Sequence, residues 1–120
     1  MIKHIKTPAL IMGAGNKEKK IEEFFGRVNS DTSEVSIARM TSPEGWVEPG
    51  QCPEFNEYTL VLKGTLKVAS SDGEILVSEG QAILTGKGEW VQYSSPFAGG
   101  AEYVAVCLPA FAMDLVKRDE

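Results

Sequence analysis

The chain is poor in histidine and cysteine and contains no long apolar run. Its single histidine, His4, excludes a metal site built from three imidazoles of one subunit. The two cysteines, Cys52 and Cys107, are too few for a disulfide scaffold and are typical of free thiols in a reducing compartment. No apolar stretch approaches the roughly 20 residues of a membrane-spanning helix. The segment ALIM is too short for a signal-peptide core. We therefore expect a cytoplasmic protein with no membrane partner.

An excess of positive charge is also absent. The net charge is -5, and no basic face is visible, which argues against a nucleic-acid partner. Apolar residues make up 42% of the 120-residue chain and charged residues 24%, an ordinary globular balance. We expect one domain over residues 1–120, with an N-terminal strand and helix at 1–30, a barrel at 34–108 and a tail at 109–120.

The N-terminal region predicts a short strand followed by a helix. Residues 1–12 read as extended, because Pro8 blocks a continuous helix. Asn16 is a suitable N-cap for the segment KEKKIEEFF, and Gly26 is a suitable end. Ile21, Phe24 and Phe25 lie at helical spacing, so we expect them to form the buried stripe and the charged residues around them to face solvent.

From residue 34 onward the apolar period is that of strands. The gaps between the strands are rich in glycine, proline, serine and aspartate, and Gly64 is expected to form a turn between two of the strands. Short strands at nearly regular spacing favour an antiparallel barrel or sandwich. The expected strands are 35–40, 58–64, 65–70, 74–80, 82–86, 89–95 and 101–108, and the tail reads as one helical turn.

Two glycine-containing blocks resemble the motifs of the cupin superfamily. The first runs from Gly50 to Gly64, with Glu57 six intervening residues before Gly64; the second runs from Gly80 through Gly86 and Gly88. The resemblance covers residues 35–108. It implies an all-β fold, the double-stranded β-helix or jelly-roll barrel, here with a short N-terminal helix and a C-terminal helical turn.

The resemblance also identifies where a cupin metal site would lie. Cupins that hold a metal typically use two histidines and a glutamate from the first motif and one histidine from the second. The corresponding positions here are Gln51, Pro53, Glu57 and Val91. An oxygen-rich set of Gln51, Glu54 and Glu57 would suit a hard divalent ion, with Glu54 included if the loop turns it inward. We expect no cofactor, with such a divalent metal as the alternative.

A closer likeness is to the cupin proteins of ethanolamine utilisation, which also lack the metal histidines. The segments FNEYTLVLKGTL, VQYSSP and YVAVCLPAF resemble the corresponding strands of that family. The family is linked to an acetate-kinase-like activity. No phosphate loop in this chain supports that activity, which remains a minor alternative.

The alternation of side chains along a strand predicts a covered outer face. If Glu57 points into the barrel, then Tyr58, Leu60 and Leu62 point outward and form an apolar face. The N-terminal segment, the predicted helix or a second subunit must cover it. Cupins commonly pair through such a face, so we predict a homodimer, with an exchange of the 1–12 strand between subunits as one variant.

The same alternation predicts the inner wall of the barrel, where a small-molecule site is expected. We expect Glu57 and Tyr93 to be the catalytic residues, Glu57 as a general base whose pKa is raised by desolvation. Structural interpretations stand beside these: Arg39 as a partner for Glu57, and Tyr93 as a core residue. The expected substrate-binding residues are Arg39, Gln51, Trp46, Thr59 and Val91.

Three functions remain open from the sequence. The first is binding of a small polar metabolite, a carboxylate or sugar derivative, with an isomerase or lyase reaction that needs no metal. The second is an atypical metalloenzyme with the oxygen-rich site. The third is a non-catalytic dimeric accessory or regulatory protein, because a fold does not determine a function.

Overall fold

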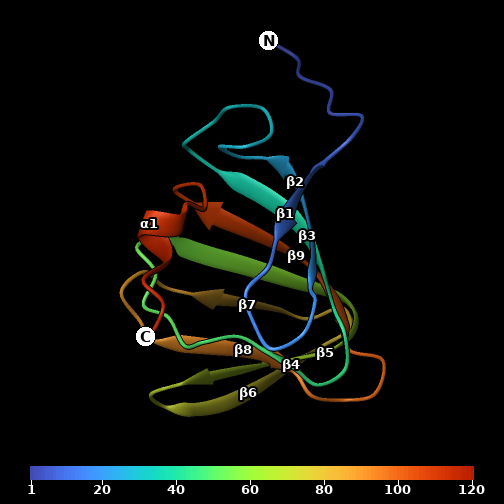
Figure 1. Cartoon of the computed structure of the whole chain (residues 1–120), viewed down its shortest axis with the longest axis vertical. Coiled ribbons are helices and arrows are strands. Elements are labelled where there is room, and N and C mark those ends of the chain that lie inside the picture. The colour runs from blue at the N-terminus through green and yellow to red at the C-terminus, as the bar shows by residue number, and fades with distance from the viewer.

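The computed structural model describes all residues from 1 to 120, and the regular secondary structure of the chain is almost entirely β-strand (Figure 1). One short helix, α1 (Met113–Val116), lies near the C-terminus. The strands are β1 (Ala9–Met12), β2 (Lys20–Phe25), β3 (Ser36–Ser42), β4 (Trp46–Val47), β5 (Asn56–Ser70), β6 (Gly73–Ser78), β7 (Ala82–Thr85), β8 (Val91–Ser95) and β9 (Ala101–Leu108).

The strands form a curled antiparallel sheet in which β5 belongs to both halves. Its first part pairs with β9 and β7, and its second part pairs with β6 and β8. The order β1-β2-β3-β9-β5 continues the first half, and β4 pairs with β8 in the second. The two halves enclose a core that includes Trp46, Val61, Leu66, Val91 and Tyr103.

Gly64 bends β5 where the strand passes from one half to the other. We predicted a turn between two strands here, and this was wrong: the strand continues from Asn56 to Ser70. Gly64 has φ 75°, and a Cβ at this position would lie 2.1 Å from the carbonyl oxygen of Gly100. Only glycine combines this backbone conformation with such a close approach of another chain segment.

The predicted alternation along β5 is confirmed. Glu57, Thr59 and Val61 are buried, whereas Tyr58 and Leu60 are 44% and 45% exposed. The inward side chains therefore build the interior, and the outward ones leave an apolar strip on the surface of β5, β7 and β9.

The predicted N-terminal helix is wrong, because the segment KIEEFF forms strand β2. β2 pairs with β3, and β1 pairs with β2, so the two strands form a hairpin that extends the sheet beyond β3. Lys19, Ile21 and Glu23 alternate toward the interior of the roll, a pattern of period 2 that the phenylalanines concealed. Pairing with an available sheet edge outweighed the local helix propensity.

The expected single helical turn after the last strand is observed as α1. The tail then runs beside the loop that follows β4, with hydrogen bonds from the Cys52 amide to the Lys117 carbonyl (3.0 Å) and from the Asp119 amide to the Gly50 carbonyl (2.8 Å). No helix of this structure has the length and apolar character needed to cross a bilayer.

Candidate functional site

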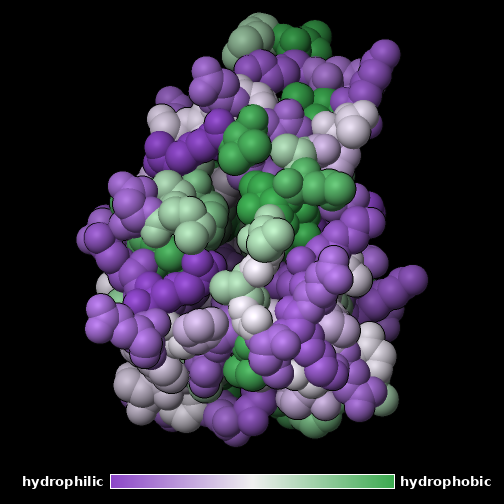
Figure 2. All heavy atoms as spheres, in the orientation of Figure 1, coloured by the Kyte–Doolittle hydropathy of each residue, from purple (hydrophilic) through white to green (hydrophobic).

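A cavity of about 470 Å³ opens between the N-terminal hairpin, the inner face of the sheet and the C-terminal tail. Figure 2 shows hydrophobic residues gathered around a hollow between α1 and β1. The apolar part of the lining includes two strongly exposed methionines, Met12 and Met113. The polar part consists of Lys19, Glu23, Ser36, Glu48, Gln51, Glu57 and Arg118. The cavity lining thus combines apolar side chains with charged and amide groups.

Glu57 contributes a buried carboxyl group to this cavity. Strand β5 holds it between Thr85 of β7 and Cys107 of β9 in the sheet register. The residue is 9% exposed, and its carboxyl group makes no hydrogen bond or ion pair within the chain. Desolvation, followed by the charge of Glu48, raises the pKa of Glu57 from 4.5 to about 7, while Lys19 opposes the rise.

Lys19 contributes a buried cation next to the carboxyl groups. Its Nζ lies 4.3 Å from the centre of the Trp46 ring and 5.3 Å from that of Tyr103. Burial alone lowers the pKa of Lys19, but Tyr103, Glu48 and Glu57 outweigh burial and raise it above the ordinary value. The ammonium group is therefore charged at neutral pH.

Glu48, Gln51 and Arg118 complete the polar wall. Gln51 forms isolated β-bridges with both Val91 and Arg118, so the loop after β4 and the tail lie side by side. The Gln51 Oε1 and the Arg118 Nε are buried without a hydrogen-bond partner. Desolvation raises the pKa of Glu48, and Lys19 and Arg118 oppose that rise. Buried polar atoms of native proteins are usually paired, so these atoms are the ones that a bound molecule would satisfy.

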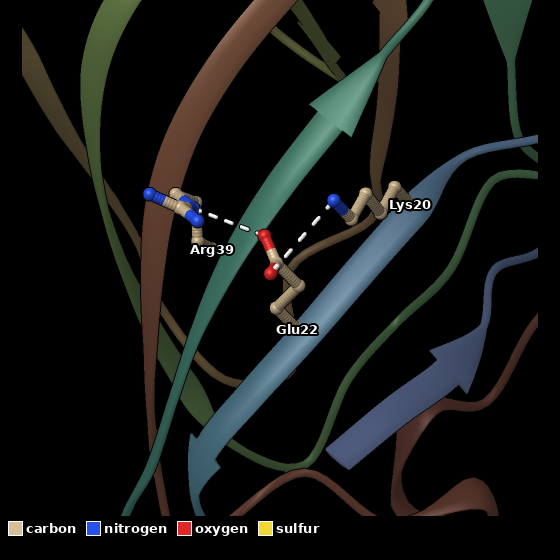
Figure 3. A network of polar contacts seen from close by, with 3 residues as sticks. All are labelled: Lys20, Glu22 and Arg39. Atoms are coloured by element: carbon tan, nitrogen blue, oxygen red, sulfur yellow. Dashed lines mark hydrogen bonds and ion pairs between the residues drawn. The ribbon is translucent and has the colours of Figure 1, made fainter. Parts of the chain in front are cut away.

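The prediction that Arg39 lines the inner wall is wrong. Arg39 lies on the outer face of β3, where its Nε donates a hydrogen bond of 3.0 Å to Glu22. Figure 3 shows Glu22 between Arg39 and Lys20, whose Nζ is 3.8 Å from the Glu22 carboxylate. The hydrogen bond from Arg39 lowers the pKa of Glu22. Alternation along β3 places Ala38 and Met40 on the cavity side and Arg39 on the other.

The remaining predicted residues divide between the cavity and the core. Gln51 and Glu57 line the cavity as expected, whereas Glu54 is exposed to solvent and does not reach it. Three of the expected substrate-binding residues, Thr59, Val91 and Trp46, are fully buried in the core. Tyr93 is also buried in the core, and its hydroxyl shares a hydrogen bond of 2.7 Å with Thr85. Burial raises the pKa of Tyr93 well above its ordinary value, so its hydroxyl stays protonated.

Sequence reasoning missed Lys19, Glu48 and Arg118. Lys19 was assigned to the solvated face of a helix that does not form. The available signal was the alternation of Lys19, Ile21 and Glu23, which a strand interpretation would have placed on one side. No sequence pattern marks Arg118, because only the antiparallel pairing of the tail with Gln51 brings it to the cavity.

Comparison with solved structures shows the fold of the chain, which is the cupin fold. It is similar to the EutQ protein of Clostridium difficile, with a TM-score of 0.65 and 22% identity over 78% of this chain and 64% of that one. A predicted oxalate decarboxylase of Thermotoga maritima gives a TM-score of 0.72 and 18% identity, over 91% of this chain and 99% of that one. The polyketide cyclase RemF of Streptomyces resistomycificus gives 0.73 and 18%, over 100% and 87%.

The sequence comparisons identify a relative that matches over part of its length. No family model matches the chain. The chain is 40% identical over 101 residues to a Myxococcus xanthus protein called endoribonuclease YbeY. The match covers 84% of this chain but 34% of the YbeY protein, so the chain spans about a third of the length of this curated relative. It also spans 64% of the C. difficile EutQ chain.

The side chains present do not fit the usual cupin metal. Oxalate decarboxylase, a metal-dependent protein, shares the fold, so a protein with this fold can use a metal. In this chain no three histidine, cysteine, aspartate or glutamate side chains converge on one point. Glu54 faces solvent, and the cation nearest Glu57 and Glu48 is the Lys19 ammonium. The chemistry proposed below therefore involves only the side chains of this chain.

Proposed function

We propose that the chain binds a small molecule in this cavity and that Glu57 exchanges a proton with it, in an isomerase or lyase type of reaction without a metal. The observation that carries the proposal is the buried Glu57 carboxyl group, which lines the cavity and has no hydrogen-bond partner in the chain. In the same cavity the Gln51 Oε1 and the Arg118 Nε are buried without a partner, which is costly, and a ligand would supply the missing partners.

The raised pKa of Glu57 supports the role of a general acid and base. With a pKa of about 7, the carboxyl group is divided between its two protonation states near neutral pH. A group with a pKa near the working pH accepts and returns protons efficiently. Tyr93, the second catalytic candidate, stays in the core with its hydroxyl bonded to Thr85, and so we assign it no proton transfer.

The lining favours a ligand with an apolar body and a polar end. The lining offers an amide and a guanidinium at Gln51 and Arg118, and apolar surface at Ile11, Met12, Met40, Phe111 and Met113. A sugar, polar on all sides, would leave hydroxyl groups against the methionines without partners. A small carboxylate or carbonyl compound with an apolar body fits both parts of the lining.

The experiment combines ligand discovery with exchange of deuterium. A library of small carboxylates and carbonyl compounds is screened by thermal shift, and hits are incubated with the protein in D₂O. We expect deuterium to enter next to the carbonyl with the wild type and not with Glu57→Gln, which keeps the shape of the side chain. Arg39→Gln, on the outer face, is the matched control and should exchange normally. Exchange that survives in Glu57→Gln would overturn the proposal.

We also propose a homodimer formed through the outer face of β5, β7 and β9. Tyr58, Leu60, Ala82, Leu84 and Val106 line an apolar groove there. Neither the predicted helix nor the N-terminal segment covers this face. The predicted helix is a strand, and the N-terminal hairpin extends the sheet at β3 (Figure 1). A second copy would bury this surface and remove its contact with water. The same face supports the alternative of a non-catalytic dimeric accessory protein.

The location is proposed as cytoplasmic. Cys52 is exposed and Cys107 is buried, and both are free thiols, the form that a reducing compartment maintains. Fractionation of cells that make the protein would test this, and recovery from a secreted fraction would contradict it.

A further inference from the structure

The Lys19 ammonium is an isolated cation inside the cavity. The residue is 8% exposed and lines the cavity. The faces of Trp46 and Tyr103, at 4.3 and 5.3 Å, hold the charge by cation–π attraction. No carboxylate makes a direct ion pair with it, although other lysines of the chain make such pairs.

The aromatic residues that hold Lys19 are themselves fixed. The Trp46 Nε1 donates a hydrogen bond of 2.9 Å to the Ala14 carbonyl, in the loop between β1 and β2. The Tyr103 hydroxyl lies 3.2 Å from the Ser42 Oγ. An ammonium group has three hydrogens to donate, of which the Tyr103 hydroxyl engages one, and ring faces do not accept the others as oxygens do. The position of the cation is thus set in advance, while part of its hydrogen-bonding capacity stays free.

The surrounding charges come from four parts of the chain. Glu57 of β5, Glu48 beyond β4 and Glu23 of β2 supply carboxyl groups, and Arg118 of the tail supplies a second cation. The Glu23 carboxylate is already engaged, because it accepts hydrogen bonds of 3.0 and 2.8 Å from the amides of Val28 and Asn29. Only Glu48 and Glu57 therefore compete with a ligand for the Lys19 charge.

We infer that Lys19 is the oxyanion-binding residue of this cavity, and that the ligand presents a carbonyl or acidic oxygen to its ammonium group. The inference rests on the proposed function, since it concerns the same ligand. It extends that function by assigning the substrate class: a compound with an acidic C–H bond next to a carbonyl group, on an apolar body. The energetic reason is that a charge-assisted hydrogen bond in a water-poor site strongly stabilises a developing oxyanion.

The step balances without any further reactant. The ionised Glu57 carboxylate takes the proton from the carbon next to the carbonyl, and the C–H electron pair becomes the new C=C bond. The carbonyl π pair moves to oxygen, and the resulting negative charge lies against Lys19. If the compound also has a C=C bond at the next position, this enolate is conjugated with it, and return of the proton from Glu57 to the far carbon of that bond gives the conjugated isomer and restores the carboxylate.

The test uses 4-nitrophenol, a flat ring with one acidic oxygen whose ionised form is visible by its absorbance. We expect the wild type to bind the phenolate form preferentially, which lowers the apparent pKa of the bound probe relative to the free probe. In Lys19→Gln we expect phenolate binding to weaken by about tenfold or more, the loss of one charge-assisted hydrogen bond. The neutral ring 4-nitrotoluene should bind both proteins alike.

Two controls separate this inference from the others. Lys20→Gln removes the neighbouring exposed lysine and should leave phenolate binding unchanged. Glu57→Gln should keep or strengthen phenolate binding while abolishing deuterium exchange, so failure of the Glu57 proposal and failure of this one give different results. The pKa shift of the probe on wild-type protein needs no variant, which guards against misfolding of Lys19→Gln. A bound probe that stays neutral, no binding, or equal phenolate affinity of Lys19→Gln and wild type would each overturn the inference.

Discussion

The Lys19 ammonium lies 4.3 Å from the centre of the Trp46 ring, and Lys19 lines the cavity of the roll. Trp46 is fully buried, and its ring nitrogen is bonded to the Ala14 carbonyl. The hairpin β1–β2 therefore supplies both the cation and the backbone group that orients its aromatic support. This relationship explains how the Lys19 ammonium is held in place in the cavity without a direct ion pair to a carboxylate.

The contact between Lys19 and Trp46 should be measurable as a coupling energy. In a double-mutant cycle of Lys19→Met and Trp46→Phe, we expect a favourable coupling of about 0.5–2 kcal/mol, the range of cation–π pairs from exposed to desolvated. Urea unfolding followed by circular dichroism gives the four free energies of unfolding. A coupling indistinguishable from zero would show that the ring does not support the charge.

The stability of the protein should depend on pH through Glu57. In the folded state the Glu57 carboxyl group has a pKa of about 7, whereas in the unfolded chain its pKa is 4.5. The stabilisation from the neutral carboxyl group is therefore complete below the unfolded pKa and is lost as the pH rises through the folded pKa. At about pH 8, Glu57→Gln should be more stable than wild type by up to about 3 kcal/mol.

Urea unfolding curves of the two proteins over this pH range check the prediction. The difference should shrink toward zero on the acid side of the unfolded pKa. A difference independent of pH would mean that Glu57 titrates normally in the folded protein.

The outer face should determine the oligomeric state. Leu60 and Leu84 are 45% and 54% exposed on this face, and a charge there would oppose burial against a second copy. We expect wild type to elute as a dimer and Leu60→Glu and Leu84→Glu as monomers, by size exclusion with light scattering. Leu76→Glu is the control, since Leu76 is 52% exposed on β6, away from the groove. A monomeric wild type would exclude the homodimer.

Gly64 should be far less tolerant of a side chain than Gly73, although both have positive φ. A Cβ at Gly64 would meet the Gly100 carbonyl, while one at Gly73 has open space around it. We expect Gly64→Ala to cost more than the roughly 1–3 kcal/mol of backbone strain alone, and Gly73→Ala to cost about that strain. Thermal unfolding by calorimetry compares the two, and equal losses would refute the steric argument.

Removal of divalent metal should leave the protein unchanged. Because Lys19 supplies the cation beside Glu57 and Glu48, we expect dialysis against a chelator to alter neither the melting temperature nor ligand binding. Elemental analysis of untagged protein before dialysis completes the test. Stoichiometric metal whose loss lowers the melting temperature would favour the oxygen-rich metalloenzyme instead.

Much of the barrel was predictable because strands carry their own signal. Alternation along β5 placed Glu57 inside and Leu60 outside, and this needs only the two-residue period of a strand. The segment around Phe24 and Phe25 was not predictable in this way. Its apolar residues are spaced as in a helix, whereas its charged residues are spaced as in a strand. The open edge of β3 decided between them.

The sequence by itself determined the all-β class, the inward carboxyl group at position 57 and the impossibility of a three-histidine centre. These follow from composition and from the geometry of a single strand. Only the tertiary structure decided which charges meet. Lys19 and Arg118 are separated by almost the whole chain, and they reach one cavity through strand pairing at the two ends of the roll, which no local pattern encodes.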